Sequence, residues 1–269
     1  MDQNLADRLA QMVRGADPDR YFATLFAPPD ARPYLFALYA FHAEVARIAE
    51  NVREPMLGAI RLEWWRETVE GAAHGAPRNH DVAQGLAALF AERAITPAPF
   101  ESLIAARAFD HAHDMLSDMT AFTAYVDSTS VALMRLAALI LGSDPHASAD
   151  VTHHAGLAYG MAGLIRALPF HAARHKLYLP LDVLKEHDLT PQDVFHMEHA
   201  DPRLIAVLRQ IGLLARDHFR QARLHRPGVA LAAILPAALV PVYLRRMTRE
   251  VPIHRRQMAL LSAAVKRRL

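Results

Sequence analysis

The stretch 164-LIRALPFHAARHKLYLPLDVL-184 decides the fold of this chain. It begins as an apolar helix and runs into a basic segment that ends in the turn Tyr178-Leu179-Pro180. Cationic or imidazole side chains precede its first carboxylate, Asp182, at five positions: Arg166, His171, Arg174, His175 and Lys176. Positive charge gathered in this way is typical of a site that binds an anion, and also of a solvated basic loop. Both interpretations stay open.

The remainder of the chain predicts an all-α fold. Of its 269 residues, 52% are hydrophobic and only 11 are glycine, and Ala, Leu and Arg are helix formers. Apolar residues recur at helical spacing, and no segment alternates apolar and polar residues as a strand does. There is no Gly/Ser-rich linker and no internal repeat, so we expect one domain over residues 1–269. One helix is predicted to begin at Asp17, the N-cap, with Pro18 at its first position.

Several functional classes are excluded. The chain has no cysteine, which rules out disulfides, thiolate nucleophiles and cysteine zinc sites. Dinucleotide, P-loop, zinc-protease and serine-hydrolase motifs are absent, as is any pattern typical of nucleic-acid recognition. His153-His154 and the pair His196 and His199 lack the order of a metal site.

The location of the protein is predicted to be cytoplasmic. No secretory signal precedes the first helix, and the apolar stretch 229–244 is short and interrupted by prolines, as in a buried core helix. The formal net charge is only +2, yet the segment 245–269 is basic. A basic C-terminal helix at about 245–269 predicts either a solvated helix packed on the body or peripheral contact with the inner face of the cytoplasmic membrane.

A candidate metal site lies in the predicted helix over 97–118. Asp110, Asp114 and Asp118 recur there at i, i+4 and i+8, beside His111 and His113. Carboxylates at this spacing are suited to Mg²⁺ with a phosphate substrate, but they also form an ordinary solvated stripe. The spacing alone leaves both possibilities.

The order of four segments resembles the squalene/phytoene synthase family, whose members join two prenyl diphosphates head to head. These segments are YAFHAEVARIAEN, LEWWRE, YVDSTSVALMRLAALILG and GLAYGMAGLIRALPFHAARHKLYLPLDVL, and the likeness runs from about residue 20 to residue 245. The resemblance implies a single-domain isoprenoid synthase fold with helices around a central cavity. It also implies two aspartate-rich motifs that hold Mg²⁺ against the substrate diphosphates.

Both of those motifs are degenerate here. Laying the first on the chain from Phe41 without a gap puts Ala46, Arg47 and Glu50 at its three acidic positions. The second puts Ala167, Phe170 and His171 at its three acidic positions. One glutamate therefore remains where the family carries a set of carboxylates, and we expect no bound metal and no cofactor.

The resemblance thus favours a non-catalytic protein. The basic segment and LEWWRE are similar to a divergent branch of the family that includes the mitochondrial assembly factor for respiratory complex I, which implies complex I subunits as protein clients. A lipid or isoprenoid could still occupy the cavity. Its anionic head group would meet the candidate anion-binding residues Arg166, Arg174, His175, Lys176 and Tyr178.

Two alternatives remain. A divergent, Mg²⁺-dependent prenyl transferase would need a displaced acid set, drawn from Glu44, Glu50, Asp110 and Asp114. This requires the segment around Asp110 to face the cavity. A different enzyme built on the same fold would centre on His171 as an acid or base.

Overall fold

The computed structural model describes residues 1–52, 54–111, 114–196 and 201–269, and within these ranges every regular element is a helix. His113 and His199 lie outside the described residues. The elements, in chain order, are α1 (Gln3–Ala16), α2 (Pro18–Thr24), α3 (Arg32–Asn51), α4 (Pro55–Ala73), α5 (Asp81–Glu92), α6 (Ala98–Ala106), η1 (Arg107–Asp110), α7 (Met119–Val126), η2 (Asp127–Val131), α8 (Ala132–Ile140), α9 (Ala149–Ala172), α10 (Leu181–Glu186), α11 (Pro191–His196), α12 (Pro202–Ala222), η3 (Gly228–Ala230), α13 (Leu231–Ile234), η4 (Leu235–Leu239), α14 (Val240–Arg246) and α15 (Ile253–Lys266).

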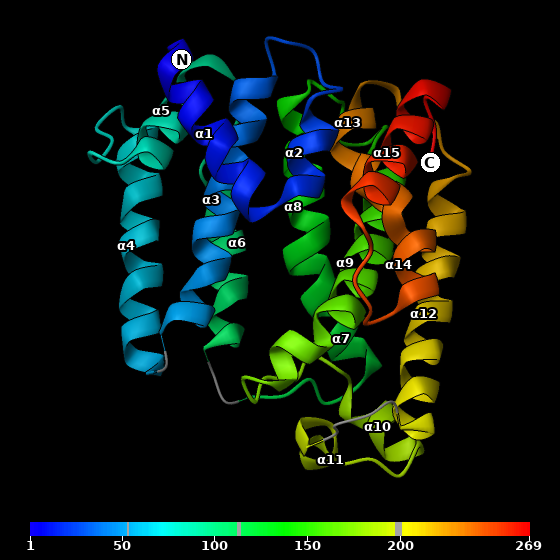
Figure 1. Cartoon of the computed structure of the whole chain (residues 1–269). Helices are drawn as coiled ribbons and strands as arrows, with labels where there is room; N and C mark the ends of the chain where they lie inside the picture. Colours follow the sequence, from blue (N-terminus) through cyan, green and yellow to red (C-terminus); the bar gives the residue numbers. More distant parts are fainter. Residues whose placement is uncertain (53, 112–113, 197–200) are drawn as a thin grey trace.

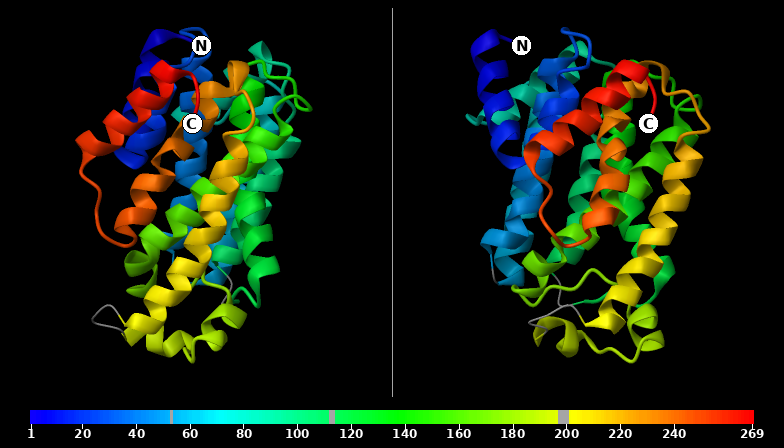
Figure 2. Two further views of the ribbon diagram at one scale, coloured as in Figure 1. Left: turned by 90° about the vertical axis from the view of Figure 1, so that its right-hand side faces the viewer. Right: turned by 45° about the vertical axis from the view of Figure 1, so that its right-hand side comes forward.

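The long helices stand side by side, with α3 and α4 at one side and α12 at the other (Figure 1). Both chain termini lie at one end of the bundle, and the short α10 and α11 cover the opposite end (Figures 1 and 2). One apolar core joins α1, α3, α4, α5 and α6 to α8, and a second surrounds α9, α12 and α14. The predicted all-α, single-domain fold is confirmed.

Two glycines allow α9 to lie against η2, a turn of π-helix. A Cβ atom added at Gly156 would lie 2.7 Å from the Val131 Cα, and one added at Gly160 would lie 2.7 Å from the Ser130 Cβ. Real Cβ atoms do not approach other atoms so closely, so glycine is required at this contact. The contact places the polar residues of η2 beside the middle of α9, where the functional site is built.

The N-cap prediction for α2 is confirmed. The Asp17 carboxylate accepts a hydrogen bond from the Arg20 backbone N–H at 2.9 Å, and Pro18 opens the helix. The same carboxylate contacts the Arg20 guanidinium at 2.5 Å. Asp17 therefore positions the Arg20 side chain as well as the start of α2.

The predicted helix over 97–118 is wrong beyond Ala106. The chain continues as the short 3-10 helix η1 and then as non-helical backbone from Asp114 to Ser117. Asp118 caps the next helix, accepting from the Ala121 backbone N–H at 2.8 Å. Asp110, Asp114 and Asp118 therefore share no helix face, because an aspartate that caps one helix cannot continue the helix before it.

The most apolar segment, Gly228–Arg246, is long and apolar enough by composition to cross a membrane. Here it is divided into η3, α13, η4 and α14 and packs into the core, where Leu235, Ala237 and Leu239 are fully buried. The basic C-terminal helix is shorter than expected. It covers Ile253–Lys266, and Arg245 and Arg246 belong to the end of α14.

Candidate functional site

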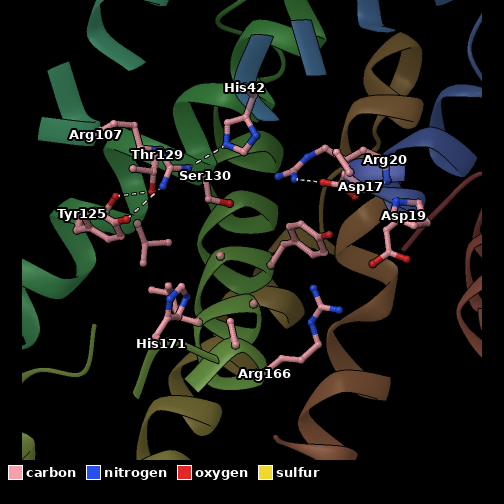
Figure 3. Close-up of a pocket in the computed structure, with 18 of the residues that line it drawn as sticks. Asp17, Asp19, Arg20, His42, Arg107, Tyr125, Thr129, Ser130, Arg166 and His171 are labelled. Atoms are coloured by element: carbon pink, nitrogen blue, oxygen red, sulfur yellow. Dashed lines mark hydrogen bonds and ion pairs between the residues drawn. The ribbon is translucent and has the colours of Figure 1, made fainter. Parts of the chain in front are cut away.

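A cavity of about 380 Å³ lies at the centre of the bundle, between α2, α3, α7, α9 and α15. Arg107 and Tyr125 face it from one side, and Asp17, Asp19 and Arg20 face it from the other (Figure 3). In the same view His42 of α3 closes one end, and Arg166 and His171 of α9 lie at the opposite end.

A smaller pocket of about 160 Å³ adjoins the cavity and shares Arg107, Tyr125, Leu164 and His171 with it. This pocket brings the two degenerate motifs face to face. Its lining includes the following motif positions: Ala46 and Glu50 from α3, and Phe170 and His171 from α9. The remaining motif position of α9, Ala167, lines the main cavity. Five of the six positions that the ungapped overlay selects therefore line two adjoining pockets.

Two of the predicted residues lie elsewhere. Glu44 and Arg47 line a separate hollow of about 370 Å³ between α3 and the Trp64-Trp65 pair of α4. Because α3 turns by about 100° per residue, the pair 44 and 47 is centred roughly 110° around the helix from the pair 46 and 50. The displaced acid set that a divergent transferase would need therefore loses Glu44.

Asp110 reaches the smaller pocket, but its carboxylate is fully engaged. One oxygen accepts from the Tyr125 hydroxyl at 2.7 Å and from the Tyr178 hydroxyl at 3.1 Å. The other accepts from Arg107 at 3.0 Å, and the Asp110 side chain is only 3% exposed. Burial raises the pKa of Tyr125 well above its ordinary value, so both tyrosines act as neutral donors. Asp114, by contrast, is exposed in non-helical backbone.

Arg107 also orders His42. Its second terminal nitrogen lies 3.0 Å from His42 Nε2. A guanidinium can only donate, so His42 Nε2 accepts and the imidazole is neutral. Burial, together with the charges of Arg107 and Arg20, lowers the pKa of His42 well below its ordinary value, which agrees with this assignment.

The carboxylates on the opposite wall of the cavity are also paired with arginines. Asp19, which is 3% exposed, accepts from the Arg256 guanidinium at 2.8 Å and from the Tyr243 hydroxyl. Burial raises the pKa of Asp19 despite these two partners. Asp17 is paired with Arg20. Each aspartate on this wall is thus matched by its own arginine.

Arg166 is the cation of the cavity that forms no ion pair with a described carboxylate. Its guanidinium carbon lies 4.6 Å from the centre of the Tyr243 ring, a cation-π contact that leaves its N–H groups available. His171 lies nearby with its ring 4.7 Å from that of Tyr178. Burial lowers the pKa of His171 to about 4, so it adds no charge near neutral pH.

These residues do not fit a magnesium cluster. Mg²⁺ takes oxygen ligands, chiefly carboxylates that are free to coordinate. The aspartates of both pockets are occupied by arginines, and Glu50 is exposed at the edge. Among the residues that the structure describes, no three Asp, Glu or His side chains are grouped so that they could hold a metal ion. Of the fallback catalytic set, Glu50 and Asp110 line the smaller pocket, whereas Asp114 is exposed and lines neither hollow.

The remaining candidate anion-binding residues are divided. Arg174, Lys176 and Tyr178 line the smaller pocket, where Arg174 covers the Phe170 ring at 3.7 Å. His175 has a backbone φ of 51° and packs its ring on Phe195 of α11, outside both pockets. The Tyr178 hydroxyl donates its hydrogen bond to the Asp110 carboxylate, so Tyr178 has a structural role.

Sequence reasoning missed the arginines that neutralise the cavity, Arg20, Arg107 and Arg256, and the partners His42, Tyr125 and Tyr243. One signal was available for Arg20, since it stands three residues after an N-cap aspartate. The other residues come from segments far apart in sequence, and no local pattern joins them.

Comparison with known proteins then places the chain. A model of squalene/phytoene synthases matches residues 13–263. The chain belongs to the squalene/phytoene synthase family. A solved dehydrosqualene synthase superimposes with a TM-score of 0.81 over 98% of this chain and 96% of that one, at 14% identity, which establishes a shared fold.

Within the family, the chain is similar to two kinds of protein. It is 28% identical over 242 residues to human "NADH dehydrogenase (ubiquinone) complex I, assembly factor 6", covering 90% of this chain and 72% of the human one. It is 27% identical over 248 residues to presqualene diphosphate synthase of Zymomonas mobilis, covering 90% of this chain and 84% of that one. The similarity to assembly factors extends to proteins of cattle, mouse and slime mould.

Proposed function

We propose that this protein is a non-catalytic member of its family that assists the assembly of respiratory complex I. The observation that carries the proposal is the state of the cavity. Positions 46, 167, 170 and 171, where the family motifs require acids, line two adjoining pockets and carry no carboxylate, while the nearby aspartates are paired with arginines. A diphosphate leaving group needs metal ions to neutralise its developing charge, and this site lacks the ligands for them.

The similarity to complex I assembly factor 6 supports complex I as the client. It covers nine-tenths of this chain, including the two helices on which the acids are missing. The proposed partner is therefore a subunit or intermediate of complex I, and the proposed location is the inner face of the cytoplasmic membrane. A lipid or isoprenoid with an anionic head group is the proposed occupant of the cavity, held by Arg166.

The C-terminal helix supports peripheral contact with the membrane. Met258, Leu261 and Val265 of α15 are 63%, 41% and 73% exposed and form one stripe at helical spacing, with Arg255 and Lys266 also exposed on the same helix. Leu260, Ala263 and Ala264 fix the other side of the helix to the body. Such a helix can lie on an anionic surface without leaving the fold.

Two measurements test the proposal. Deleting the gene is expected to lower the amount of assembled complex I, seen on native gels of the membranes, and complementation with the wild-type gene is expected to restore it. Purified protein is expected to release no pyrophosphate from farnesyl diphosphate with Mg²⁺. Unchanged complex I in the deletion strain would contradict the assembly role, and pyrophosphate release that Glu50→Ala abolishes would establish the prenyl transferase alternative instead.

A further inference from the structure

A groove of about 810 Å³ lies on the outside of the bundle. It lies between the end of α9, α11, α12, the end of α14 and the linker 247–249. Helix α9 separates it from the central cavity. Leu168, Pro169, Ala172 and Ala173 face the groove, whereas Arg166 and His171 face the cavity, and the two hollows share no lining residue.

The floor of the groove is apolar. Leu168, Val194 and Leu208 are buried beneath it, and the more open lining residues Phe195, Leu204, Ile205 and Met247 continue the same apolar surface. Apolar side chains from three helices and a linker thus converge on one concave surface. A concave apolar surface of this volume falls within the range of about 300 to 1,000 Å³ that is usual for sites of small amphiphilic molecules.

The edge of the groove is cationic. Arg209 comes from α12, Arg245 and Arg246 from the end of α14, and Arg249 from the linker. Within the described residues none of these four forms an ion pair with a carboxylate. The acid in the lining, Asp201, already accepts from Arg203 at 2.8 Å. Arginines that gather at a partly apolar surface without acidic partners favour an anionic ligand.

The backbone conformation at Met247 brings these arginines to the same groove. Met247 ends α14 with a φ of 50°, in the left-handed region that a side chain with a Cβ rarely adopts. This turn directs the linker so that Arg249 and the helical pair Arg245 and Arg246 line the same groove. The strain at Met247 therefore coincides with the convergence of the cations.

We propose that this groove binds an anionic membrane phospholipid, with an acyl chain on the apolar floor and the phosphate held by the arginines. A guanidinium donates in a fork that matches two phosphate oxygens, so two arginines can hold one phosphate. An acidic helix of a protein partner would need a longer and flatter contact, since specific protein interfaces cover about 800 Å² on each partner. This site goes beyond the proposed function and does not depend on it.

Calorimetric titration with short-chain lipids, used as monomers, tests the site. Dioctanoyl phosphatidylglycerol is expected to fill the groove with one molecule per chain, and a molecule held by Arg166 in the central cavity would appear as a second binding step that variants of the groove leave unchanged. Dioctanoyl phosphatidylcholine has the same chains and the same phosphate, but its choline carries a positive charge that the four arginines repel, so it is expected to bind at least about tenfold more weakly. Glycerol phosphate, which has no acyl chain, is expected to show no measurable heat.

The matched variants separate the groove from the rest of the molecule. Arg209→Gln combined with Arg249→Gln should weaken phosphatidylglycerol binding by about tenfold or more, and Ile205→Ser should weaken it through the floor. Arg216→Gln changes an exposed arginine of the same helix outside the groove and should leave binding unchanged. Neither Arg209 nor Arg249 has a carboxylate partner in the described structure. The double variant therefore leaves no buried carboxylate without its counter-ion, and it is expected to keep the melting temperature of the wild type.

Three results would overturn the proposal. Loss of binding in Arg166→Gln, with full binding in the double variant, would place the lipid in the central cavity. Equal binding of the two phospholipids would show that the arginines do not select the head group. If no lipid binds and the double variant instead loses capture of complex I subunits, the groove is a protein-docking surface.

Discussion

Arg107 and Asp110 form an ion pair of 3.0 Å at the centre of the protein, with the Asp110 side chain 3% exposed. The same guanidinium reaches His42 of α3 and the Tyr125 hydroxyl of α7. One arginine thus connects η1 to two neighbouring helices. A carboxylate that could bind a metal ion is used here to hold the cavity wall together.

Removing the charge of Asp110 should therefore be costly. Asp110→Asn would leave Arg107 buried without its counter-ion, and breaking such a pair lowers the free energy of unfolding by about 3 to 5 kcal/mol. Urea denaturation measures the loss. Asp114→Asn, at an exposed position four residues further on, is the control and should change stability by less than about 0.5 kcal/mol. Similar losses in both variants would contradict the role given to the ion pair.

Replacing the missing acids should restore metal binding. Ala46 and His171 line the smaller pocket from α3 and α9, beside Glu50. In the variant Ala46→Asp/His171→Asp, millimolar Mg²⁺ is expected to raise the melting temperature by a few degrees, since a ligand that binds only the folded state stabilises it. The wild type should show no such shift. Arg47→Asp, at a motif position that faces the other hollow, is the control. No response in the double variant would mean that the surrounding cations exclude the metal by themselves.

Stability should fall as the solution becomes acidic. The pKa of His42 is lowered in the folded state by burial and by Arg107, so below pH about 6.5 the unfolded chain binds more protons than the folded one. The free energy of unfolding then decreases as pH falls from 7 towards 4, and His171, whose pKa burial lowers to about 4, adds to the same trend. His42→Gln keeps an acceptor for Arg107 and should make the decrease shallower in denaturation curves. The exposed His146→Gln should reproduce the wild-type pH dependence. A steeper curve for His42→Gln would be the opposite of this expectation.

The contribution of the ion pair between Arg256 and Asp19 to stability can be tested against a control at the neighbouring residue, Arg255. Arg256→Gln removes the guanidinium that lies 2.8 Å from a buried carboxylate, and a loss of about 3 kcal/mol is expected in thermal or urea unfolding. Arg255→Gln changes the exposed neighbour and should cost less than about 0.5 kcal/mol. If the two variants unfold alike, the contact to Asp19 contributes nothing to stability.

The fold could be predicted from the sequence because its signals are local. Apolar spacing identifies each long helix, and the cap at Asp17 and Pro18 marks the start of α2. The extent of the helix before Asp110 could not be predicted, because the break depends on Asp118 capping α7 rather than on a proline or glycine. Helix formers on both sides of the break conceal it.

The site could be predicted only where it follows a motif. Ala46, Ala167 and His171 were located because the family pattern fixes their spacing, and the structure brings them to adjoining pockets. The arginines that balance the aspartates follow no spacing, since Asp19 and Arg256 stand 237 residues apart. A contact of that kind is set by the packing of whole helices, which a pattern of single residues does not contain.

That separation also governs when the cavity can form. Asp19 is held by Tyr243 and Arg256, so its wall is complete only after synthesis has passed Arg256. The core around α3, α5 and α6 draws mainly on earlier residues and can form sooner, since local contacts form faster than distant ones. A nascent chain that has not yet reached Arg256 would thus hold Asp19 exposed to water, without the arginine that it pairs with in the folded protein.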